Sequence, residues 1–321
     1  MADFPGEIGA VPIVSGTPPK LAFRIVREET AVNVGPTGIE IAYQRFGDPA
    51  DPPVLLIMGG NAQMIHWPDG FCSELIARGL HVIRFDNRDA GRSTHFRDAP
   101  VPDFAAALNG DFSSASYTLA DMADDTVGLL DALDLDSAHL VGQSLGGMIA
   151  QTVAIEHPFR VRSLTSISSN TGDPKVGQAD LSALASLGKP AEDREGYIDW
   201  MVKATRLTAS SPGFPFDEST VRATTALAYD RGHDPGAFPR QGISVLAYGD
   251  RTEKLKHVKV PTLVLHGSAD PSVEGGRATA AAIPGSKLVI FEGMGHNLPR
   301  ELWCTIANHI ADLVHSAEKP A

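Results

Sequence analysis

The segment 142–146 reads Gly-Gln-Ser-Leu-Gly and places Ser144 between two glycines, with one residue on either side. A buried-strand pattern precedes this segment and a helical pattern follows it. In that context the spacing G-x-S-x-G is typical of a nucleophilic serine, because small residues let the strand and the helix approach closely. The hydroxyl then projects from a sharp turn. The pattern predicts acyl transfer through a covalent serine ester, with Ser144 as the nucleophile.

A serine nucleophile needs a base, and the base needs an acid that orients it. His296 follows the apolar run Lys287–Phe291, and Asp270 follows the run Thr262–Leu265. Parallel strands place such loops at one edge of a sheet, where sites gather. We therefore predict His296 as the base and Asp270 as the acid, with Asp173 as the alternative acid. The rate should rise as the base loses its proton, near pH ~6–7.

Two further groups should complete the chemistry. The oxyanion of an acyl-transfer intermediate needs two N–H donors. We expect the amide of Leu145, directly after the serine, and the amide of Gly60 in the Met-Gly-Gly-Asn loop 58–61. His266 ends a strand beside the Asp270 loop and could support the acid. The cysteine and histidine spacings show no zinc pattern, so we expect neither a metal nor an organic cofactor.

The elements that must position these residues alternate between strand and helix. Short apolar runs predict strands buried on both faces: Val54–Met58, His81–Phe85, Ala138–Val141, Val161–Ile167, Thr262–Leu265 and Lys287–Phe291. Helical periodicity appears over residues 118–134, 145–157 and 299–315. Two further stretches, Phe23–Glu28 and Gly38–Arg45, predict a hairpin. The alternation predicts an α/β fold with a mostly parallel central sheet flanked by helices.

The domain organisation follows from where this alternation stops. We expect an extended N-terminal arm over residues 1–20. We expect the α/β core to consist of residues 21–169 and 259–321. Residues 170–258 lack buried-strand runs and predict an inserted helical cap. The cap should set substrate choice for a small to medium ester. We expect a substrate pocket lined by Asn61, His66, Trp200, Phe214, Phe216 and Phe238.

Composition excludes several other classes of protein. The chain has 321 residues with 27 basic and 39 acidic side chains, a formal net charge of −12. That balance argues against nucleic acid as a partner, and no apolar run is long enough to cross a membrane. The N-terminal segment has no signal-peptide pattern, which favours a cytoplasmic protein. Two cysteines, Cys72 and Cys304, are expected as free thiols. A monomer or homodimer is expected.

The motifs together resemble those of α/β-hydrolase-fold serine hydrolases over residues 38–315. The segment 86–93, Asp-Asn-Arg-Asp-Ala-Gly-Arg-Ser, resembles the D-x-R-G-x-G-x-S segment of that family, with Asp89 in place of the usual glycine. Residues 56–61 and 67–69 are similar to those of aclacinomycin methylesterase-like bacterial carboxylesterases. Met58 stands where most members have histidine. The resemblance implies a carboxylic ester hydrolase with a Ser-His-Asp catalytic triad, an oxyanion hole and a cap domain.

Other activities fit the same residues. A cofactor-free perhydrolase or a C–C bond hydrolase can use the same three side chains. A ligand sensor could keep them and signal through movement of the cap. For the esterase, the partners are a small-molecule ester and water.

Overall fold

The computed structural model describes residues 7–8, 27–178, 182–209 and 213–319. Within these residues the strands form one sheet in the order β1-β9-β8-β7-β6-β4-β5-β3-β2. The strands β2 and β3 pair antiparallel, as do β3 and β5, and all other pairs are parallel. Their bounds are β1 (Glu7–Ile8), β2 (Glu29–Val34), β3 (Ile39–Phe46), β4 (Pro53–Ile57), β5 (His81–Phe85), β6 (Ala138–Gln143), β7 (Val161–Ile167), β8 (Thr262–Gly267) and β9 (Lys287–Phe291).

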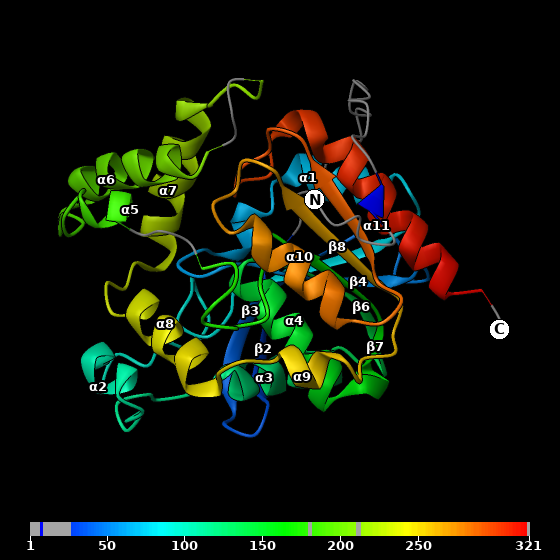
Figure 1. Cartoon of the computed structure of the whole chain (residues 1–321), viewed down its shortest axis with the longest axis horizontal. Helices are drawn as coiled ribbons and strands as arrows, with labels where there is room; N and C mark the ends of the chain where they lie inside the picture. Colours follow the sequence, from blue (N-terminus) through cyan, green and yellow to red (C-terminus); the bar gives the residue numbers. More distant parts are fainter. Residues whose placement is uncertain (1–6, 9–26, 179–181, 210–212, 320–321) are drawn as a thin grey trace.

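Helices cover both faces of this sheet (Figure 1). The flanking helices are α1 (Asp69–Ile76), α3 (Leu119–Ala132), α4 (Leu145–Glu156), α9 (Thr252–Leu255), α10 (Val273–Ala282) and α11 (Trp303–Ala317). The helices α1 and α11 pack together on one face, and α3, α4, α9 and α10 cover the other. The mostly parallel α/β architecture predicted from the apolar runs is therefore confirmed, and all six buried strands lie within a few residues of their predicted bounds.

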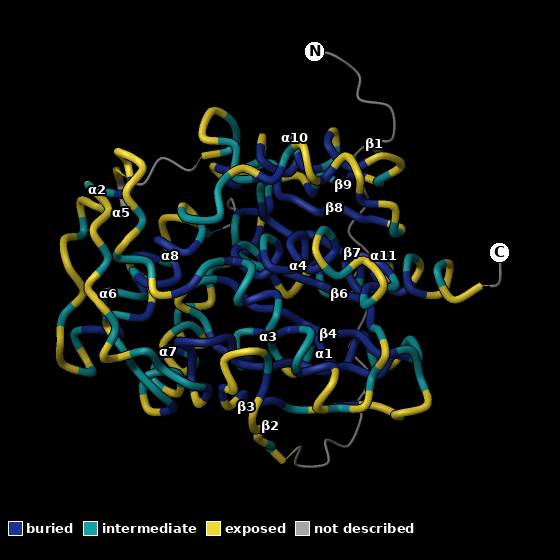
Figure 2. Tube along the Cα trace, turned by 90° about the horizontal axis from the view of Figure 1, so that it is seen from below, coloured by how far each residue is buried: buried dark blue, intermediate teal, exposed yellow. Residues whose placement is uncertain are grey.

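The core strands are buried on both faces because helices cover both sides. Every residue of β4, β5 and β6 is buried, and Figure 2 shows the central strands as buried tube. The apolar side chains divide into two clusters, one under α3 and α4 and the other under α1 and α11. This double burial explains why the strands read as continuous apolar runs rather than alternating ones.

The predicted hairpin needs one correction. The strand that pairs with β3 is β2, which runs from Glu29 to Val34, and of the predicted span Phe23–Glu28 the described residues Arg27 and Glu28 precede it. The pairing with β3 shifts register between Ala31 and Val34, where Asn33 has a φ of 56°. This bulge breaks the alternation of buried and exposed residues that marks a half-buried strand. Residues 23–26 and most of the arm expected over 1–20 lie outside the described residues, apart from Glu7 and Ile8 in β1.

A group of helices lies between β7 and β8 in sequence: α5 (Ser182–Ala185), α6 (Arg194–Leu207), α7 (Glu218–Gly232) and α8 (Ala237–Tyr248). Figure 1 shows α6 and α7 together, to one side of the sheet. Both helices carry long exposed or half-buried stretches. The short helix α2 (Phe104–Leu108) contacts α8. No helix among the described residues is long and apolar enough to span a membrane.

The two cysteines are free thiols. Cys72 is buried in α1, where burial raises the pKa of its thiol to about 12. Cys304 lies in α11, with its sulfur 3.2 Å from the Arg78 guanidinium. The expectation of free thiols is confirmed for both.

His139 of β6 is a buried titratable group remote from the predicted site. Its Nδ1 lies 2.8 Å from Ser163 Oγ and its Nε2 lies 3.0 Å from Glu318 Oε1. Burial lowers the pKa of His139 from 6.5 to about 4, although the Glu318 carboxylate acts in the opposite direction. The unfolded chain therefore binds a proton at this residue in a pH range where the folded chain does not. The contribution of neutral His139 to the free energy of unfolding therefore has its full value above pH ~6.5 and is lost as the pH falls toward about 4.

Replacing His139 with glutamine tests this linkage, because glutamine keeps polar contacts but does not titrate. We expect the free energy of unfolding of the wild type, minus that of His139→Gln, to fall by about 2 to 3 kcal/mol between pH ~6.5 and 4. Urea unfolding at a series of pH values measures this difference. A difference that stays constant across the range would contradict the linkage.

Candidate active site

Ser144 lies at the turn between β6 and α4 with an unusual backbone conformation. Its φ is 54° and its ψ is −119°, a region that costs a non-glycine residue about 1–3 kcal/mol. The turn is held because the Ser144 N–H donates to the Ile167 carbonyl on β7 at 2.9 Å. Ser169 Oγ also donates to the Ser144 carbonyl, at 2.8 Å. A strained serine that neighbouring strands hold in place is the geometry expected of a nucleophile elbow.

The two glycines of the motif are needed for close approach. A side chain on Gly142 would collide with the Gly146 carbonyl at the start of α4. A side chain on Gly146 would collide with the carbonyl oxygen of Ile57 at the end of β4. The strand, the turn and the helix can therefore pack this closely only with glycine at both positions.

Asp270 and His296 meet at the carboxyl ends of β8 and β9. The distance between Asp270 Oδ2 and His296 Nδ1 is 2.8 Å. An ionised carboxylate can only accept hydrogen bonds, so Nδ1 carries the proton in this pair. In the neutral ring, Nε2 then has the free lone pair that a general base needs. His296 is 34 % exposed, whereas Asp270 is almost fully buried behind it.

Asp270 is held in place on both carboxylate oxygens. Its Oδ1 accepts from the Ser272 backbone N–H at 2.9 Å and from Ser272 Oγ at 2.7 Å. Its Oδ2 also lies 3.2 Å from His266 Nε2. Burial by itself raises the pKa of Asp270, but the hydrogen bonds from His266 and His296 outweigh burial and hold this pKa well below its usual range. The carboxylate is therefore ionised at neutral pH.

The backbone of His296 is fixed by two contacts from other parts of the chain. Its carbonyl accepts from Gln143 Nε2 at 2.9 Å, and its N–H donates to the Thr208 carbonyl at 2.9 Å. Gln143 directly precedes Ser144, so the serine turn and the histidine loop are tied together. Thr208 directly follows α6 as its C-terminal cap, so the loop is also tied to that helix.

Ser144 and His296 line one large cavity of about 1370 Å³. The walls come from the sheet edge and from α6, α7 and α8. All six residues expected in the substrate pocket also line it: Asn61, His66, Trp200, Phe214, Phe216 and Phe238. Burial lowers the pKa of His66 to about 4, so this ring is neutral at physiological pH.

Of the two expected oxyanion donors, one directly follows the serine and the other lies in the glycine loop that lines the same cavity. Leu145 is the first residue of α4, and the first N–H groups of a helix have no carbonyl of that helix to bond. Gly60 lines the cavity, one residue past Gly59. A side chain on Gly59 would lie 3.2 Å from Ser144 Cβ, so the glycine loop passes directly beside the serine.

The alternative acid lies elsewhere. Asp173 Oδ1 accepts from the Lys175 backbone N–H at 2.8 Å, within its own loop. Within the part of the chain that the structure describes, the carboxylate hydrogen-bonded to His296 is that of Asp270.

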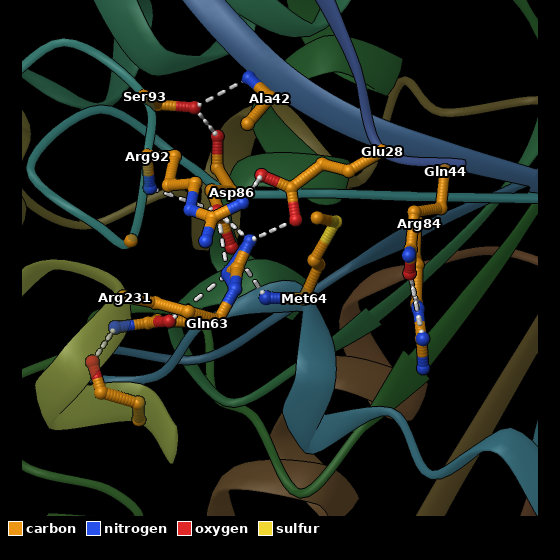
Figure 3. A network of polar contacts seen from close by, with 12 residues as sticks. Glu28, Ala42, Gln44, Gln63, Met64, Arg84, Asp86, Arg92, Ser93 and Arg231 are labelled. Carbon is orange, nitrogen blue, oxygen red and sulfur yellow. Dashed lines mark hydrogen bonds and ion pairs between the residues drawn. The ribbon is translucent and has the colours of Figure 1, made fainter. Parts of the chain in front are cut away.

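A buried ionic network ties α7 to the core beside the cavity (Figure 3). Asp86, which follows β5, accepts from Arg231 of α7 at 2.9 Å and from the Met64 backbone N–H at 2.7 Å. Arg231 also donates to Glu28 Oε2 at 2.9 Å. Both Asp86 and Arg231 are buried, so the loss of Arg231 would leave the Asp86 carboxylate inside the protein without its cationic partner.

One side-chain group among the described residues has the spacing of metal ligands. Asp89, His95 and Asp234 bring one ligand atom each to within 4.8 Å of one another. However, Arg240 donates to both carboxylates, at 2.7 Å to Asp89 and 2.6 Å to Asp234. A metal cation would have to lie beside this guanidinium, so the group is better described as an ion-pair network.

Several residues of the site lie outside the sequence predictions. Ser272 and Gln143 hold Asp270 and His296, and Ser169 holds the serine turn. Gln143 occupies an open position of the G-x-S-x-G pattern, so the motif does not mark it. Ser272 follows Asp270 by two residues, and that short spacing was the available signal for a local hydrogen bond.

Comparison with known proteins gives matches over most of the chain. A family model described as the alpha/beta hydrolase fold matches residues 52–299. A rhodomycin D methylesterase from Streptomyces peucetius is 34 % identical over 279 residues, covering 79 % of this chain and 88 % of that protein. A bifunctional esterase/perhydrolase from Acinetobacter calcoaceticus is 24 % identical over 288 residues, and the match covers 82 % of this chain and 91 % of that protein. The solved structure of a thermophilic esterase from Thermogutta terrifontis has a TM-score of 0.69 at 21 % identity, covering 91 % of this chain and 100 % of that one.

Proposed function

Because the chain belongs to the alpha/beta hydrolase fold family and is a carboxylic ester hydrolase, we propose that it acts through Ser144, His296 and Asp270. The amides of Gly60 and Leu145 form the oxyanion hole in this proposal. One observation carries it. Ser144 and His296 line one cavity, while the buried Asp270 carboxylate lies 2.8 Å from His296 Nδ1.

The proposed reaction begins when His296 Nε2 takes the hydroxyl proton of Ser144. The serine oxygen bonds to the ester carbonyl carbon, and the carbonyl electron pair moves to oxygen, where the two amides bind it. Asp270 keeps the imidazole oriented and stabilises its positive charge. The bond to the alkoxy oxygen then breaks, and this oxygen leaves as an alcohol with the proton from His296. Water repeats the sequence on the acyl-enzyme and releases the acid.

We also propose the division of the chain into core and cap. The helices α5 to α8, within residues 170–258, form the cap over the core of residues 21–169 and 259–321. The walls that α6, α7 and α8 contribute to the cavity support this role. The short helix α9 also falls within the span 170–258 but packs against α4 and α10. A cytoplasmic location and a monomeric or homodimeric state stay predictions.

From the sequence we expected a small to medium ester. The cavity of about 1370 Å³ can hold a larger ester than that. Similarity to a rhodomycin D methylesterase supports a methyl ester, in which the alkoxy group is small. We therefore propose an ester with a bulky acid part and a small alkoxy group. The acid part would fill the cavity under α6 and α7, and the small alcohol would leave.

Two ester series test this assignment. Methyl esters of acids that grow from acetic to a multi-ring aromatic acid should show kcat/KM rising at least about 10-fold, because each buried group adds binding energy in the transition state. Acetates of alcohols of the same sizes should show no such rise. The opposite ranking would contradict the assignment of the cavity to the acid part.

Hydrogen peroxide in the same assay tests the perhydrolase alternative, which is favoured by the similarity to a bifunctional esterase/perhydrolase. For an esterase, water remains the acceptor and peracid stays a minor product. Peracid as the main product would favour the alternative.

A further inference from the structure

The loop that carries Gly60 contains two successive glycines between the end of β4 and a short 3₁₀ turn at Met64–His66. The N–H of Gly60 belongs to the peptide unit that joins Gly59 to Gly60. Glycine has no Cβ and can rotate about both backbone bonds, so the direction of this N–H is not set by the two residues themselves. A donor that must point at one place needs support from elsewhere.

The peptide units on either side of this one are both held by side chains. On the N-terminal side, Asn87 Nδ2 donates to the Met58 carbonyl at 2.9 Å. On the C-terminal side, the Asn61 N–H donates to Gln241 Oε1 at 2.9 Å. The Gly59–Gly60 peptide therefore lies between two neighbours that side chains hold, and this restricts the backbone rotation open to it. Asn61 has a φ of 56°, so the loop turns sharply at the second of these contacts.

Gln241 comes from α8 and is anchored at both ends of its amide. Besides accepting from Asn61, it donates through Nε2 to the Arg88 carbonyl at 3.1 Å, and its side chain is buried. The segment 86–93 thus holds the glycine loop twice, directly through Asn87 and indirectly through Gln241. Phe238 of the same helix packs closely on the loop, since a Cβ on Gly60 would lie 3.1 Å from its ring.

The helix α8 is itself fixed to this segment by a buried ion pair. Arg240, next to Gln241, donates to Asp89 through Nε at 2.9 Å and Nη2 at 2.7 Å, a two-point contact. Asp89 also accepts from Tyr117 OH at 2.6 Å and has a φ of 62°. Two-point contacts between arginine and a carboxylate fix orientation as well as distance. The position of Gln241 relative to the glycine loop is therefore firmly determined.

We propose that Asn87 and Gln241 are positioning residues that aim the Gly60 N–H at the oxyanion. The inference rests on the proposed function, in which Gly60 supplies one of the two oxyanion donors. An oriented donor stabilises charge that develops in the transition state, without having to reorganise during the reaction. Loss of either support should therefore slow the chemical step and leave binding of the ester almost unchanged.

Gln241→Met and Asn87→Leu test the proposal, since each keeps a similar volume and removes the hydrogen bond. We expect kcat to fall about 10- to 100-fold with KM within about 3-fold. Thr126→Val is the matched control, because Thr126 is buried and loses one hydrogen bond, to the Met122 carbonyl, away from the loop. It should keep kcat within about 2-fold of wild type.

The inhibition constant of a trifluoromethyl ketone distinguishes the loss of an oxyanion donor from a general loss of stability. It forms a serine-bound alkoxide that needs the oxyanion donors, so its inhibition constant should rise by the same factor as kcat falls in Gln241→Met. A ketone without fluorine stays mainly unreacted in the cavity, so its inhibition constant should be the same in Gln241→Met and in the wild type. Gln241→Glu covers the case in which Gln241→Met does not fold. It keeps the acceptor for Asn61, and its kcat relative to wild type should recover as falling pH protonates the glutamate.

The inference is overturned if folded Gln241→Met keeps kcat within about 2-fold of wild type, or if Thr126→Val loses as much. A ratio of Gln241→Glu to wild-type kcat that does not change with pH would also count against it. Persistence of turnover in Ser144→Ala would instead contradict the proposed function, and the inference with it. If turnover depends fully on Ser144 but kcat is unchanged in Gln241→Met and Asn87→Leu, the inference is contradicted and the proposed function is not.

Discussion

Ser144→Ala is expected to lower kcat for ester hydrolysis by at least about 10⁴-fold, because the hydroxyl oxygen forms the covalent bond of the acyl-enzyme. The fold should survive the change. The contacts that hold the turn involve the Ser144 backbone, namely its N–H to Ile167 and its carbonyl to Ser169. Initial rates with a methyl ester, together with thermal unfolding, separate the loss of chemistry from loss of structure.

Ser163→Ala is the control for this variant. Ser163 is a buried serine on β7, and its hydroxyl lies 2.8 Å from His139 rather than in the cavity. It should keep most of its turnover. If Ser144→Ala and Ser163→Ala retained comparable rates, the nucleophile would have to be a different residue.

Asp270→Asn is expected to lower kcat by about 10³- to 10⁴-fold near neutral pH. The wild-type carboxylate accepts from His296 Nδ1, and its depressed pKa keeps it ionised. An asparagine can present N–H to the ring instead, which favours the tautomer whose Nε2 carries the proton. That tautomer cannot take the proton of Ser144. A pH–rate profile of the variant at saturating substrate measures the loss.

Asp173→Asn is the matched control, since it makes the same chemical change at the alternative acid. Its carboxylate bonds within its own loop, and its rate should stay within about 2-fold of wild type. A large loss in Asp173→Asn together with a small loss in Asp270→Asn would transfer the role of the acid to Asp173.

Most of the fold could be predicted because its strongest physical signal is local. Strands covered by helices on both faces must be apolar at every position, so runs such as Val161–Ile167 are visible directly in the sequence. The sequence pattern places the edge strand β2 too early, because a bulge at Asn33 interrupts its alternation. In edge strands one face meets solvent, and a single extra residue then hides the pattern.

The candidate site also contains some residues that local sequence patterns predict and others that they do not. Ser144, Asp270 and His296 each follow a buried strand, so local patterns could single them out. Gln241 could not be found in this way, because its contact with Asn61 joins residues 180 positions apart. Such contacts depend on how α8 packs against the segment 86–93. A single sequence carries no periodic signal for that packing.

Labelling with a fluorophosphonate, which bonds its phosphorus to an activated serine oxygen and releases fluoride, tests most directly whether Ser144 is the nucleophile. We expect one label per chain, located on Ser144 by mass spectrometry, with ester turnover lost in proportion to labelling. The Ser144→Ala variant should take up no label. Full turnover after complete labelling of Ser144, or loss of turnover through a label on another residue, would contradict the role of Ser144 as the nucleophile.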